Sequence, residues 1–593
     1  MRAGRVFPSQ RSTQFGGDAM LRKGREWRIY NCTASYCDRP RFFSEYFWLL
    51  LMGCGCGVSI QKHHVERLPQ LISVDELRAR GERKYLIEDS IEGWAEAALE
   101  LILSYMPQYR YQSDDEVIFL YDQIRPAGAP ISSGGKAPGP EPLKRALNNI
   151  RSLLSQRVSE GAQQLRPIDC FDICGHISDA VLSGGVRRSA SIMLFSSDDQ
   201  QMMEAKTGDW WQDAPWRATA NISALIAHDP TLDELTELLS YTQQYGEPAV
   251  FFSRPSIITN PCAEIGLKPV LDVDGEEVSG WQACNLTEIV APKCSNVDEW
   301  LSACKAAAII GTLQAAYVDS GYLLEASRLI VQAEALIGVS ITGICGAPEL
   351  LTPDNLEHGA AVVKRWNQIT ADALQINAAS RLTCVKPSGN SSVLAGCSAG
   401  AHPWHAKRFI RRMRLNKLNP VWQAVSSVLP EACEDINEDT GAVMFALEAP
   451  EGAQVRSDLS AVDHMRLIEK LQRHWVANGS AHSANRVPEA AHSVSCTVTV
   501  KDDEWHAVAV WMHDHIHRTS GAQRIRGISW LSDYGDTVYA HAPYEEAREG
   551  TRSAELWDKL AGLDWSIIDL SAVSGERERP TLEPACVGGT CLL

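Results

Sequence analysis

Short β-branched runs alternate with amphipathic stretches along this chain, and this alternation most constrains its fold. Runs such as 191–195 and 494–500 are typical of strands. Stretches such as 298–318 and 359–381 repeat apolar residues every three or four positions, as helices do. The alternation predicts an α/β architecture with parallel strand pairing. No repeat of about 20 to 50 residues is visible, which argues against a solenoid or a propeller.

Two further helices are predicted on either side of a long loop. Apolar residues recur with helical spacing over 91–105 and again over 143–154. The segment 125–142 between them is dense in Pro, Gly and Ser, which forbids a helix interior and a central strand. The apolar run Phe47–Met52 is far shorter than the about 20 residues that span a bilayer, so it predicts a buried core segment and no membrane contact.

The length of the chain limits its domain organisation, and its charge limits the kinds of partner that it can bind. The 593 residues leave room for several domains of about 100 to 200 residues, or for one large α/β barrel with appendages. The 74 acidic residues outnumber the 56 basic ones, which argues against a protein that coats nucleic acid. The N-terminus lacks the apolar stretch of a secretory signal, so we expect a cytoplasmic protein.

Cysteines raise the question of redox chemistry. The 17 cysteines are too sparse for a disulfide scaffold and odd in number, so most are expected in the core. The polar stretch 575–593, interpreted as a mobile tail, carries Cys586 and Cys591 with two glycines between them. An accessible pair of this kind suits thiol-disulfide exchange. The alternatives are a pair without function and half of a zinc site.

A second cluster is Asn-Pro-Cys-Ala-Glu-Ile at 260–265. On an extended segment Asn260, Cys262 and Glu264 would share one face, because strand side chains alternate. An amide, a thiol and a carboxylate in one row could bind and deprotonate a polyol such as a ribose. The alternative is a cysteine that only packs in a barrel strand. Cys32 and Cys284 matter to this site only if the fold brings them beside Cys262.

The turn Lys-Pro-Ser-Gly-Asn-Ser-Ser at 386–392 is a candidate anion site. Its small residues and backbone N–H groups could form a nest before a helix, or an ordinary turn with a helix cap. The segment 132–137 is not a Walker loop, because Pro130 and Ala137 occupy positions that the motif reserves for other residues. The adjacent Arg187 and Arg188 could bind phosphate or end a solvated strand.

Together these motifs resemble the ribonucleotide reductases, specifically the monomeric adenosylcobalamin-dependent (class II) ribonucleoside-triphosphate reductases. The resemblance covers nearly the whole chain and implies a ten-stranded α/β barrel with a central finger loop that carries the radical cysteine. The matching segments are RIYNC (28–32), EDSIEGW (88–94), IRPAGAPISSGGKAPGPEPL (124–143), LSGGVRRSA (182–190), NPCAEI (260–265), ACNLTEI (283–289), KPSGNSS (386–392), CSAGAHPWHAKRFIRR (397–412), VSCTVTV (494–500), HAPYEE (541–546) and the terminal CVGGTC.

The resemblance implies a role for each residue of the site. Cys262 would form the thiyl radical, after the cobalt–carbon bond of the cofactor breaks, and take the 3′ hydrogen of the ribose. Glu264 would be the base on the 3′-OH, and Asn260 the amide that binds the ribose hydroxyls. Cys32 and Cys284 would protonate the leaving 2′-OH, reduce the radical intermediate and end as a disulfide. These assignments fit the chemistry of thiols, carboxylates and dithiols.

The same resemblance gives the tail and the turn their functions. Cys586 and Cys591 would reduce the disulfide of the site and be reduced in turn by thioredoxin or a similar partner. The substrate phosphates would lie on the turn, with Ser9 as a further contact. The turn residues to which the resemblance gives this role are Pro387, Ser388, Gly389, Asn390, Ser391 and Ser392.

Missing motifs favour the cobalamin-dependent class. No tyrosine follows Tyr544, so the paired C-terminal tyrosines of class I enzymes are not found, and neither is a glycyl-radical motif. Because the barrel is expected to start almost at the N-terminus, we expect no ATP-cone domain of about 90 residues. We expect the barrel to start at 1–60, a possible deoxynucleotide-effector segment at 61–125, the main barrel at 126–550, and a C-terminal region at 551–593 that ends in the redox tail.

The sequence leaves some residues without a catalytic role and allows alternative functions. Cys54 and Cys56 are expected to pack in the core, while His402 and His405 receive no role. A diphosphate substrate is an alternative to a triphosphate, since the turn does not count phosphates. A thiol-disulfide relay protein, active without cobalamin and indifferent to loss of Glu264, is an alternative of a different class. A catalytically silent nucleotide-binding relative is a third.

Overall fold

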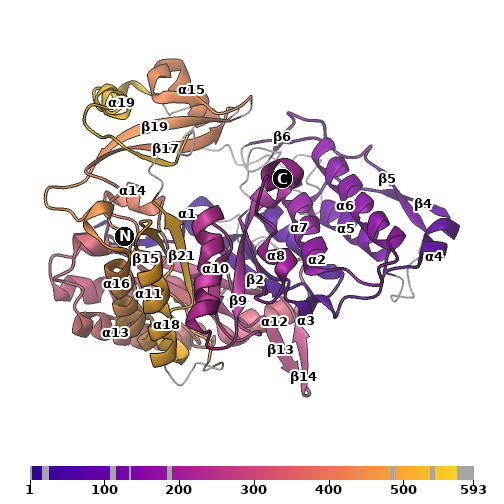
Figure 1. Cartoon of the computed structure of the whole chain (residues 1–593), viewed down its shortest axis with the longest axis horizontal. Coiled ribbons are helices and arrows are strands. Elements are labelled where there is room, and N and C mark those ends of the chain that lie inside the picture. The colour runs from indigo at the N-terminus through magenta and orange to yellow at the C-terminus, as the bar shows by residue number, and fades with distance from the viewer. Residues whose placement is uncertain are drawn as a thin grey trace.

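The computed structural model describes residues 3–15, 26–106, 115–131, 135–182, 190–417, 419–438, 440–480, 487, 489–533 and 541–569. Its centre is a ten-stranded sheet surrounded by helices, with smaller layers on two sides (Figure 1). This arrangement confirms the α/β fold expected from the sequence. The strands of the central sheet are β1 (Val6–Pro8), β2 (Cys32–Tyr36), β3 (Gly55–Ser59), β8 (Ser191–Ser196), β9 (Ala220–Ile226), β10 (Ala249–Phe252), β15 (Gln282–Val290), β16 (Ile337–Thr342), β20 (Cys496–Val500) and β21 (Gly527–Ser532).

The central sheet consists of two parallel parts joined by antiparallel pairs. Strands β2, β3, β8, β9 and β10 are parallel neighbours in that order. β15 pairs parallel with β16, and β20 with β21. The two parts meet antiparallel where β15 pairs with β2 and where β10 pairs with β21. The expectation of parallel pairing is therefore correct for most neighbours within each part. It is wrong at the two junctions and for β1, which pairs antiparallel with β15, and local sequence patterns do not encode these pairings.

The segment 382–385 connects the two ends of the sheet. Val339 of β16 forms an isolated parallel bridge with Thr383, and Val385 forms another with Val494, just before β20. The backbone bonds agree, because Cys384 N donates to Val339 O at 3.0 Å and Val385 N donates to Ser493 O at 3.2 Å. The strands thereby follow one another around a barrel.

Amphipathic helices cover the outside of the barrel (Figure 1). The predicted helix 298–318 is α11, whereas the prediction for 359–381 extends too far, because α13 ends at Leu374 and Gln375 adopts a left-handed conformation. Thr352 caps the start of α13 by accepting a hydrogen bond from Asn355 N at 3.3 Å. The larger helices of this layer are α2 (Arg41–Met52), α7 (Pro167–Leu182), α10 (Leu232–Tyr245), α11 (Val297–Ala315), α12 (Glu325–Glu334), α13 (Pro353–Leu374), α16 (Ala461–Leu471) and α18 (Trp505–Arg518).

Residues 61–125 and the helix that follows them form a layer beside α2. The two helices predicted here are confirmed as α5 (Ile91–Leu103) and α6 (Glu141–Ser159). Two parallel strands, β4 (Glu82–Leu86) and β5 (Glu116–Leu120), lie at the outer edge. Their apolar faces share one buried core with α2, which contains the predicted core run Phe47–Met52. An effector role for this segment stays a prediction.

A separate four-stranded antiparallel sheet lies above the barrel in Figure 1. Local sequence patterns did not predict this sheet, which has its own small core around Ile410, Trp422 and Trp557. Helix α19 packs on it, so residues 552–561 belong to this layer. Its elements are β17 (Arg408–Asn416), β18 (Cys433–Asp435), β19 (Thr440–Glu448), β22 (Tyr544–Glu546), α15 (Pro420–Val428) and α19 (Arg552–Ala561).

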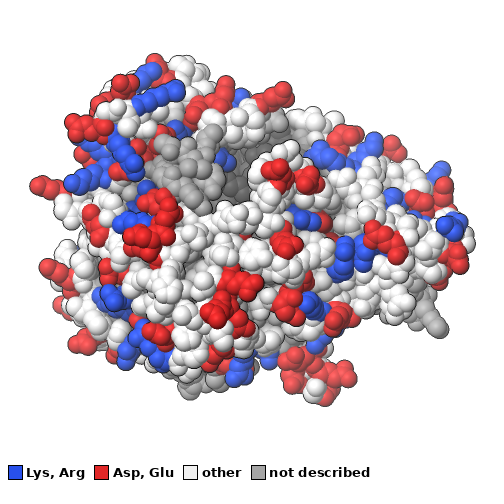
Figure 2. Space-filling model, in the orientation of Figure 1, with Lys and Arg blue, Asp and Glu red and all other residues white. Residues whose placement is uncertain are grey.

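Short elements and the surface complete the fold. Within the described ranges, no helix is both long enough and apolar enough to cross a membrane. Acidic side chains gather on the hairpin β13 (Val270–Val273) and β14 (Glu276–Ser279) at the lower edge of Figure 2. The remaining short elements are α1 (Gln10–Phe15), α3 (Lys62–Val65), α4 (Val74–Ala79), β6 (Pro130–Ile131), β7 (Gly135–Lys136), α8 (Gln200–Met203), α9 (Trp210–Asp213), β11 (Ile258–Thr259), β12 (Gly266–Leu267), α14 (Ser391–Ala395), a π-helical turn (Gln472–Val476) and α17 (Ala477–Ser480).

Candidate active site

A hairpin inside the barrel carries the Asn-Pro-Cys-Ala-Glu-Ile motif. Its strands β11 and β12 pair antiparallel, with Ile258 opposite Leu267. The motif itself forms the turn of this hairpin, because Ala263 N donates to Asn260 O at 2.9 Å and Ala263 has a φ of 61°. The expectation of an extended segment is therefore wrong, since local turn bonds replace strand pairing. The hairpin corresponds to the finger loop that the resemblance implied.

Glycines in the barrel wall make room for this hairpin. A Cβ atom added to Gly57 of β3 would lie 1.7 Å from the Thr259 carbonyl oxygen. A Cβ atom at Gly527 of β21 would lie 2.9 Å from the Cβ of Ala263, and one at Gly338 of β16 would also meet the hairpin, at Ile265. The interior of the barrel is thus filled partly by the hairpin and not only by side chains of the strands.

Two buried side chains fix the stem of the hairpin at Gly266. Arg381 Nε donates to Gly266 O at 3.1 Å, and the same guanidinium forms an ion pair with Glu334 at 2.6 Å. Gly266 N donates to His492 Nδ1 at 3.2 Å, while His492 Nε2 lies 2.9 Å from Ile337 O. Burial lowers the pKa of His492 to about 3, so the ring stays neutral and can accept this bond.

Asn260 links the hairpin to the wall of the barrel. Its side-chain oxygen accepts a hydrogen bond from Ile265 N at 3.0 Å, which fixes the orientation of the amide. Its Nδ2 donates to Cys32 Sγ on β2 at 3.1 Å. The amide therefore lies between the turn and one of the two thiols expected to act in reduction.

Cys32 and Cys284 lie directly opposite each other on neighbouring strands. They are register partners in the antiparallel pair of β2 and β15, where opposite Cα atoms lie about 4.5 to 5.5 Å apart. That separation allows a disulfide between them. Burial, and next the Glu264 carboxylate, raise the pKa of both thiols, so they are protonated at neutral pH. The fold thus brings together two residues that are about 250 positions apart in the chain.

Cys262 and Glu264 complete the group. Cys262 is accessible at the hairpin tip, yet desolvation by the surrounding barrel and the nearby Glu264 charge raise the pKa of its thiol. Glu264 is 1% exposed, and its Oε2 has no hydrogen-bond partner among the described residues. Burial raises the pKa of this carboxyl. An unpartnered buried carboxylate oxygen beside a thiol is typical of a site that awaits a polar ligand.

A third buried thiol of this region was not predicted. Cys384 lies in the segment that closes the barrel and shares a buried cluster with Cys32 and Cys284. Desolvation, and next the charge of Glu264, raise its pKa. Its local sequence gave no signal, because only the pairing of 382–385 between β16 and β20 brings it to the site.

The candidate phosphate turn follows this segment. Ser388 has a φ of 58°, and its hydroxyl donates to Glu288 on β15 in a very short contact. The predicted helix after the turn is α14, but it has only five residues, so its dipole adds little. Ser9 is buried and starts α1, where its Oγ accepts a bond from Ser12 N at 3.1 Å. Phe7, two residues before it, packs beside Ala395 and Cys397 near the turn.

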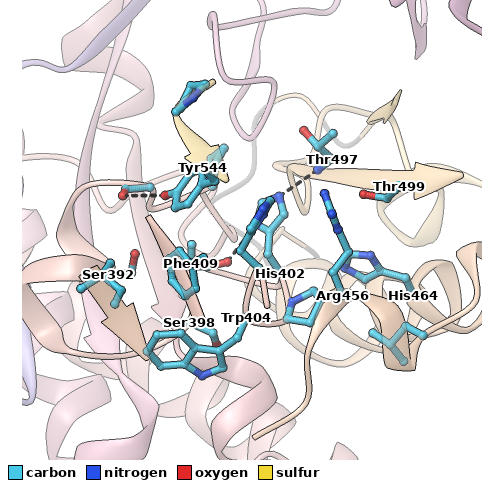
Figure 3. A pocket seen from close by; sticks show the side chains of 18 of the residues that line it. Ser392, Ser398, His402, Trp404, Phe409, Arg456, His464, Thr497, Thr499 and Tyr544 are labelled. Atoms are coloured by element: carbon cyan, nitrogen blue, oxygen red, sulfur yellow. Dashed lines mark hydrogen bonds between the residues drawn. The ribbon is translucent and has the colours of Figure 1, made fainter. Parts of the chain in front are cut away.

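A cavity of about 630 Å³ opens beside the turn, between the barrel and the four-stranded sheet (Figure 3). His402 bridges Ala399 O at 2.8 Å and Thr497 N at 3.0 Å, so both of its ring nitrogens are used. His405 stacks on Tyr544 with ring centroids 5.3 Å apart. These contacts give both histidines of the motif structural roles. Other lining residues include Val393, Trp404, Phe409, Arg456, His464 and Thr499.

The remaining predictions concern cysteines outside the hairpin site, metal binding and two adjacent arginines. Cys54 and Cys56 are buried in the core beside α2, and Cys54 Sγ lies 3.4 Å from Trp27 O, as expected for packing. Across the part of the chain that the structure describes, no group of three His, Cys, Asp or Glu side chains could hold a metal ion. Cys586, Cys591, Arg187 and Arg188 lie outside the described residues.

Comparisons with known proteins agree with this geometry. No family model matches the chain. The adenosylcobalamin-dependent ribonucleoside-triphosphate reductase of Levilactobacillus brevis is 25% identical and aligns with 93% of this chain and 79% of its own. The enzyme of the same name from Lactobacillus leichmannii is 27% identical over the same shares. The crystal structure of a B12-dependent (class II) ribonucleotide reductase matches with a TM-score of 0.72 and 21% identity, over 94% of this chain and 87% of that one.

The barrel and its central hairpin, with thiols from three elements around the tip, define a ribonucleotide reductase fold. The sequence relatives point to one class of these reductases, since they align along nearly the whole chain and share one name. Over nearly its whole length the chain is thus similar to the adenosylcobalamin-dependent ribonucleoside-triphosphate reductases, and it shares the fold of the class II ribonucleotide reductase.

Proposed function

We propose that this protein reduces ribonucleoside triphosphates to 2′-deoxyribonucleoside triphosphates with adenosylcobalamin as cofactor. One observation carries the proposal: the hairpin tip with Cys262 and Glu264 lies against the register pair Cys32 and Cys284. The similar proteins are named for this activity and this cofactor. A thiol-disulfide relay would not require the buried carboxylate of Glu264 at the hairpin tip.

Cys262 is the hydrogen-atom donor and acceptor in this proposal. Bound adenosylcobalamin would supply radical chemistry, and Cys262 would give up its thiol hydrogen atom. The raised pKa of Cys262 keeps sulfur in the S–H form, which is the form that can give up a hydrogen atom. The resulting sulfur radical takes the 3′ hydrogen of the ribose and returns it at the end of the cycle.

Glu264 and Asn260 act on the hydroxyl groups of the ribose. The free Oε2 of Glu264 accepts the 3′-OH hydrogen, and the raised pKa makes the ionised carboxylate a stronger base than an exposed one. The Asn260 amide already donates a hydrogen bond to Cys32. A ribose bound at this position would therefore contact both the Asn260 amide, which binds its hydroxyl groups, and the Cys32 thiol, which can donate a proton.

Cys32 and Cys284 supply two protons and two electrons. One thiol protonates the 2′-OH, which leaves as water, and the two sulfur atoms end as a disulfide while carbon 2′ gains a hydrogen. Cys586 and Cys591 then exchange with this disulfide and are reduced by thioredoxin or a similar dithiol. A variant with both tail cysteines replaced by Ser should keep turnover with dithiothreitol and lose it with thioredoxin as the reductant.

The cavity beside the turn has the character that the cofactor needs. A corrin is a broad, largely apolar ring with amide side chains, and the cavity combines apolar and aromatic walls with hydroxyl, imidazole and charged groups. Val393, Trp404, Phe409 and Tyr544 would hold the ring, while Thr499 would bind an amide. We therefore place the cofactor on the cavity side of the turn and the nucleotide on its barrel side.

The test is anaerobic reduction of CTP and ATP with dithiothreitol, with and without adenosylcobalamin. Wild type should form deoxynucleotide only with the cofactor, Cys262→Ser should form none, and Cys433→Ser on the distant sheet should resemble wild type. CDP and ADP run in parallel, because diphosphate reduction at equal rate would support the alternative substrate. Product without the cofactor, or from Cys262→Ser, would overturn the proposal.

A further inference from the structure

A fully buried carboxylate lies beneath the candidate phosphate turn and has no part in the reaction described above. Glu288 on β15 is 0% exposed. Its Oε2 lies 3.0 Å from the Lys386 ammonium, and its Oε1 accepts the Ser388 hydroxyl hydrogen. The turn therefore begins with two residues that are bound to one carboxylate on a barrel strand.

The position of Glu288 along β15 relates it to the reacting thiols. Glu288 and Cys284 are four residues apart and so lie on the same face of the strand. At about 3.3 Å per residue, they are separated by about 13 Å, which suits a nucleotide with its ribose at Cys284 and its phosphates at Glu288. Ser340, the register partner of Glu288 on β16, accepts a bond from Lys386 N at 2.9 Å.

The charge of Glu288 needs an explanation, because a carboxylate beneath an anion site would repel the ligand. An unpaired buried carboxylate is also costly to desolvate. Lys386 meets both requirements, since its ammonium neutralises Glu288 and is itself only 15% exposed. Burial raises the pKa of Cys262 and Glu264, and the Lys386 charge partly offsets this rise through space, which agrees with an ammonium close to the nucleotide site.

We propose that Glu288 is the positioning residue of the phosphate site and that Lys386 is its phosphate-binding cation. Glu288 holds the ammonium and the Ser388 hydroxyl before the nucleotide arrives, so the turn is preformed. Lys386 then shares its charge between Glu288 and the substrate phosphates. This inference rests on the proposed function, because it assumes that the turn binds a ribonucleotide.

The test is a double-mutant cycle read by direct binding. Binding of CTP and ATP to the full chain is measured by calorimetry, and KM and kcat are measured with adenosylcobalamin. Lys386→Met should weaken nucleotide binding by about 10-fold to 100-fold and raise KM more than it lowers kcat. Lys386→Arg keeps the charge and should bind within about threefold of wild type.

The sign of the second substitution distinguishes an electrostatic role from a merely structural one. Glu288→Gln keeps an acceptor for Ser388 and removes the repulsive charge, so binding should equal or exceed that of wild type. The double variant should bind about threefold or more tightly than Lys386→Met alone, because no uncompensated carboxylate remains. Lys268→Met, which removes a more exposed ion pair with Glu277 on the outer hairpin, should leave binding unchanged.

Three results would overturn the inference. If wild type reduces CTP and Lys386→Met keeps the wild-type Kd and KM, the inference is overturned and the proposed function stays intact. If the double variant binds nucleotide no better than Lys386→Met, the inference that Lys386 compensates the charge of Glu288 is excluded. Wild type that binds neither nucleotide would overturn the proposed function and this inference together. Thermal unfolding of each variant shows whether it remains folded.

Discussion

Gly57 offers the sharpest test of the hairpin as the element that positions Cys262, the proposed radical residue. A methyl group at this position would lie 1.7 Å from the Thr259 carbonyl oxygen, whereas Cβ atoms in proteins stay at least 3.0 Å from other heavy atoms. Gly57→Ala must therefore move the hairpin or β3 by about 1.3 Å, the difference between these two distances. The backbone of β3 is paired on both sides, so the hairpin is the part that can move.

The expected effect on catalysis is much larger than the effect on stability. A displacement of about 1 Å at a reacting group costs about 100-fold in rate, because Cys262 must meet both the cofactor radical and the ribose. Overpacking of this kind destabilises a folded core by about 1 to 3 kcal/mol, and a chain of this size tolerates such a loss. Gly57→Ala should thus remain folded while its kcat/KM for CTP falls by about 100-fold.

The assay is anaerobic CTP reduction with dithiothreitol and adenosylcobalamin, combined with circular dichroism and thermal unfolding. Gly562→Ala is the matched control, because a methyl group there would meet only ordinary contacts at 3.6 Å, far from the hairpin. This control should match wild type in both measurements. A Gly57→Ala protein with activity within about threefold of wild type would refute the view that the hairpin is held by close backbone contact.

Three further predictions concern the groups around the hairpin. A single turnover without reductant should join Cys32 and Cys284, seen by mass spectrometry as a loss of two hydrogens that Cys32→Ser abolishes. Because folding raises the pKa of Glu264 above 4.5, wild type should lose stability as pH rises above 4.5, and Glu264→Gln should lose less in thermal unfolding between pH 4.5 and 8. Arg381→Met leaves Glu334 buried without its partner and should cost about 3 to 5 kcal/mol in denaturant unfolding.

The sequence predicted those parts of the structure that depend on local pattern. Helices α5 and α6 follow from the spacing of their apolar residues. The end of α13 does not, because Gln375 leaves the helix in a left-handed conformation that no apolar spacing shows. The hairpin turn was also mistaken for strand, since alternation of residue types over 260–265 is compatible with either geometry until the bond from Ala263 N to Asn260 O is known.

The site was predicted as a set of residues but not as an arrangement. Cys32, Cys284 and the hairpin motif could be named, whereas their convergence depends on an antiparallel junction between β2 and β15. Cys384 and Glu288 could not be identified as site residues, because each is an ordinary buried position in its own segment. The register of adjacent strands in a barrel decides which of their residues are neighbours. The register between segments about 100 residues apart in the chain cannot be read from the local sequence of either one.

In the proposed function, the two segments that carry the site residues would also set the length of the nucleotide. β15 carries Cys284 and Glu288 on one face, and the closing segment runs from Cys384 directly into Lys386 and the turn. Each segment thus has a thiol at the ribose end and a charged group at the phosphate end. The Lys386 bonds to Glu288 and Ser340 tie these segments together across the sheet. A change that shifts one segment against the other should therefore disturb phosphate binding and reduction together, while the loss of Lys386 alone should affect mainly binding.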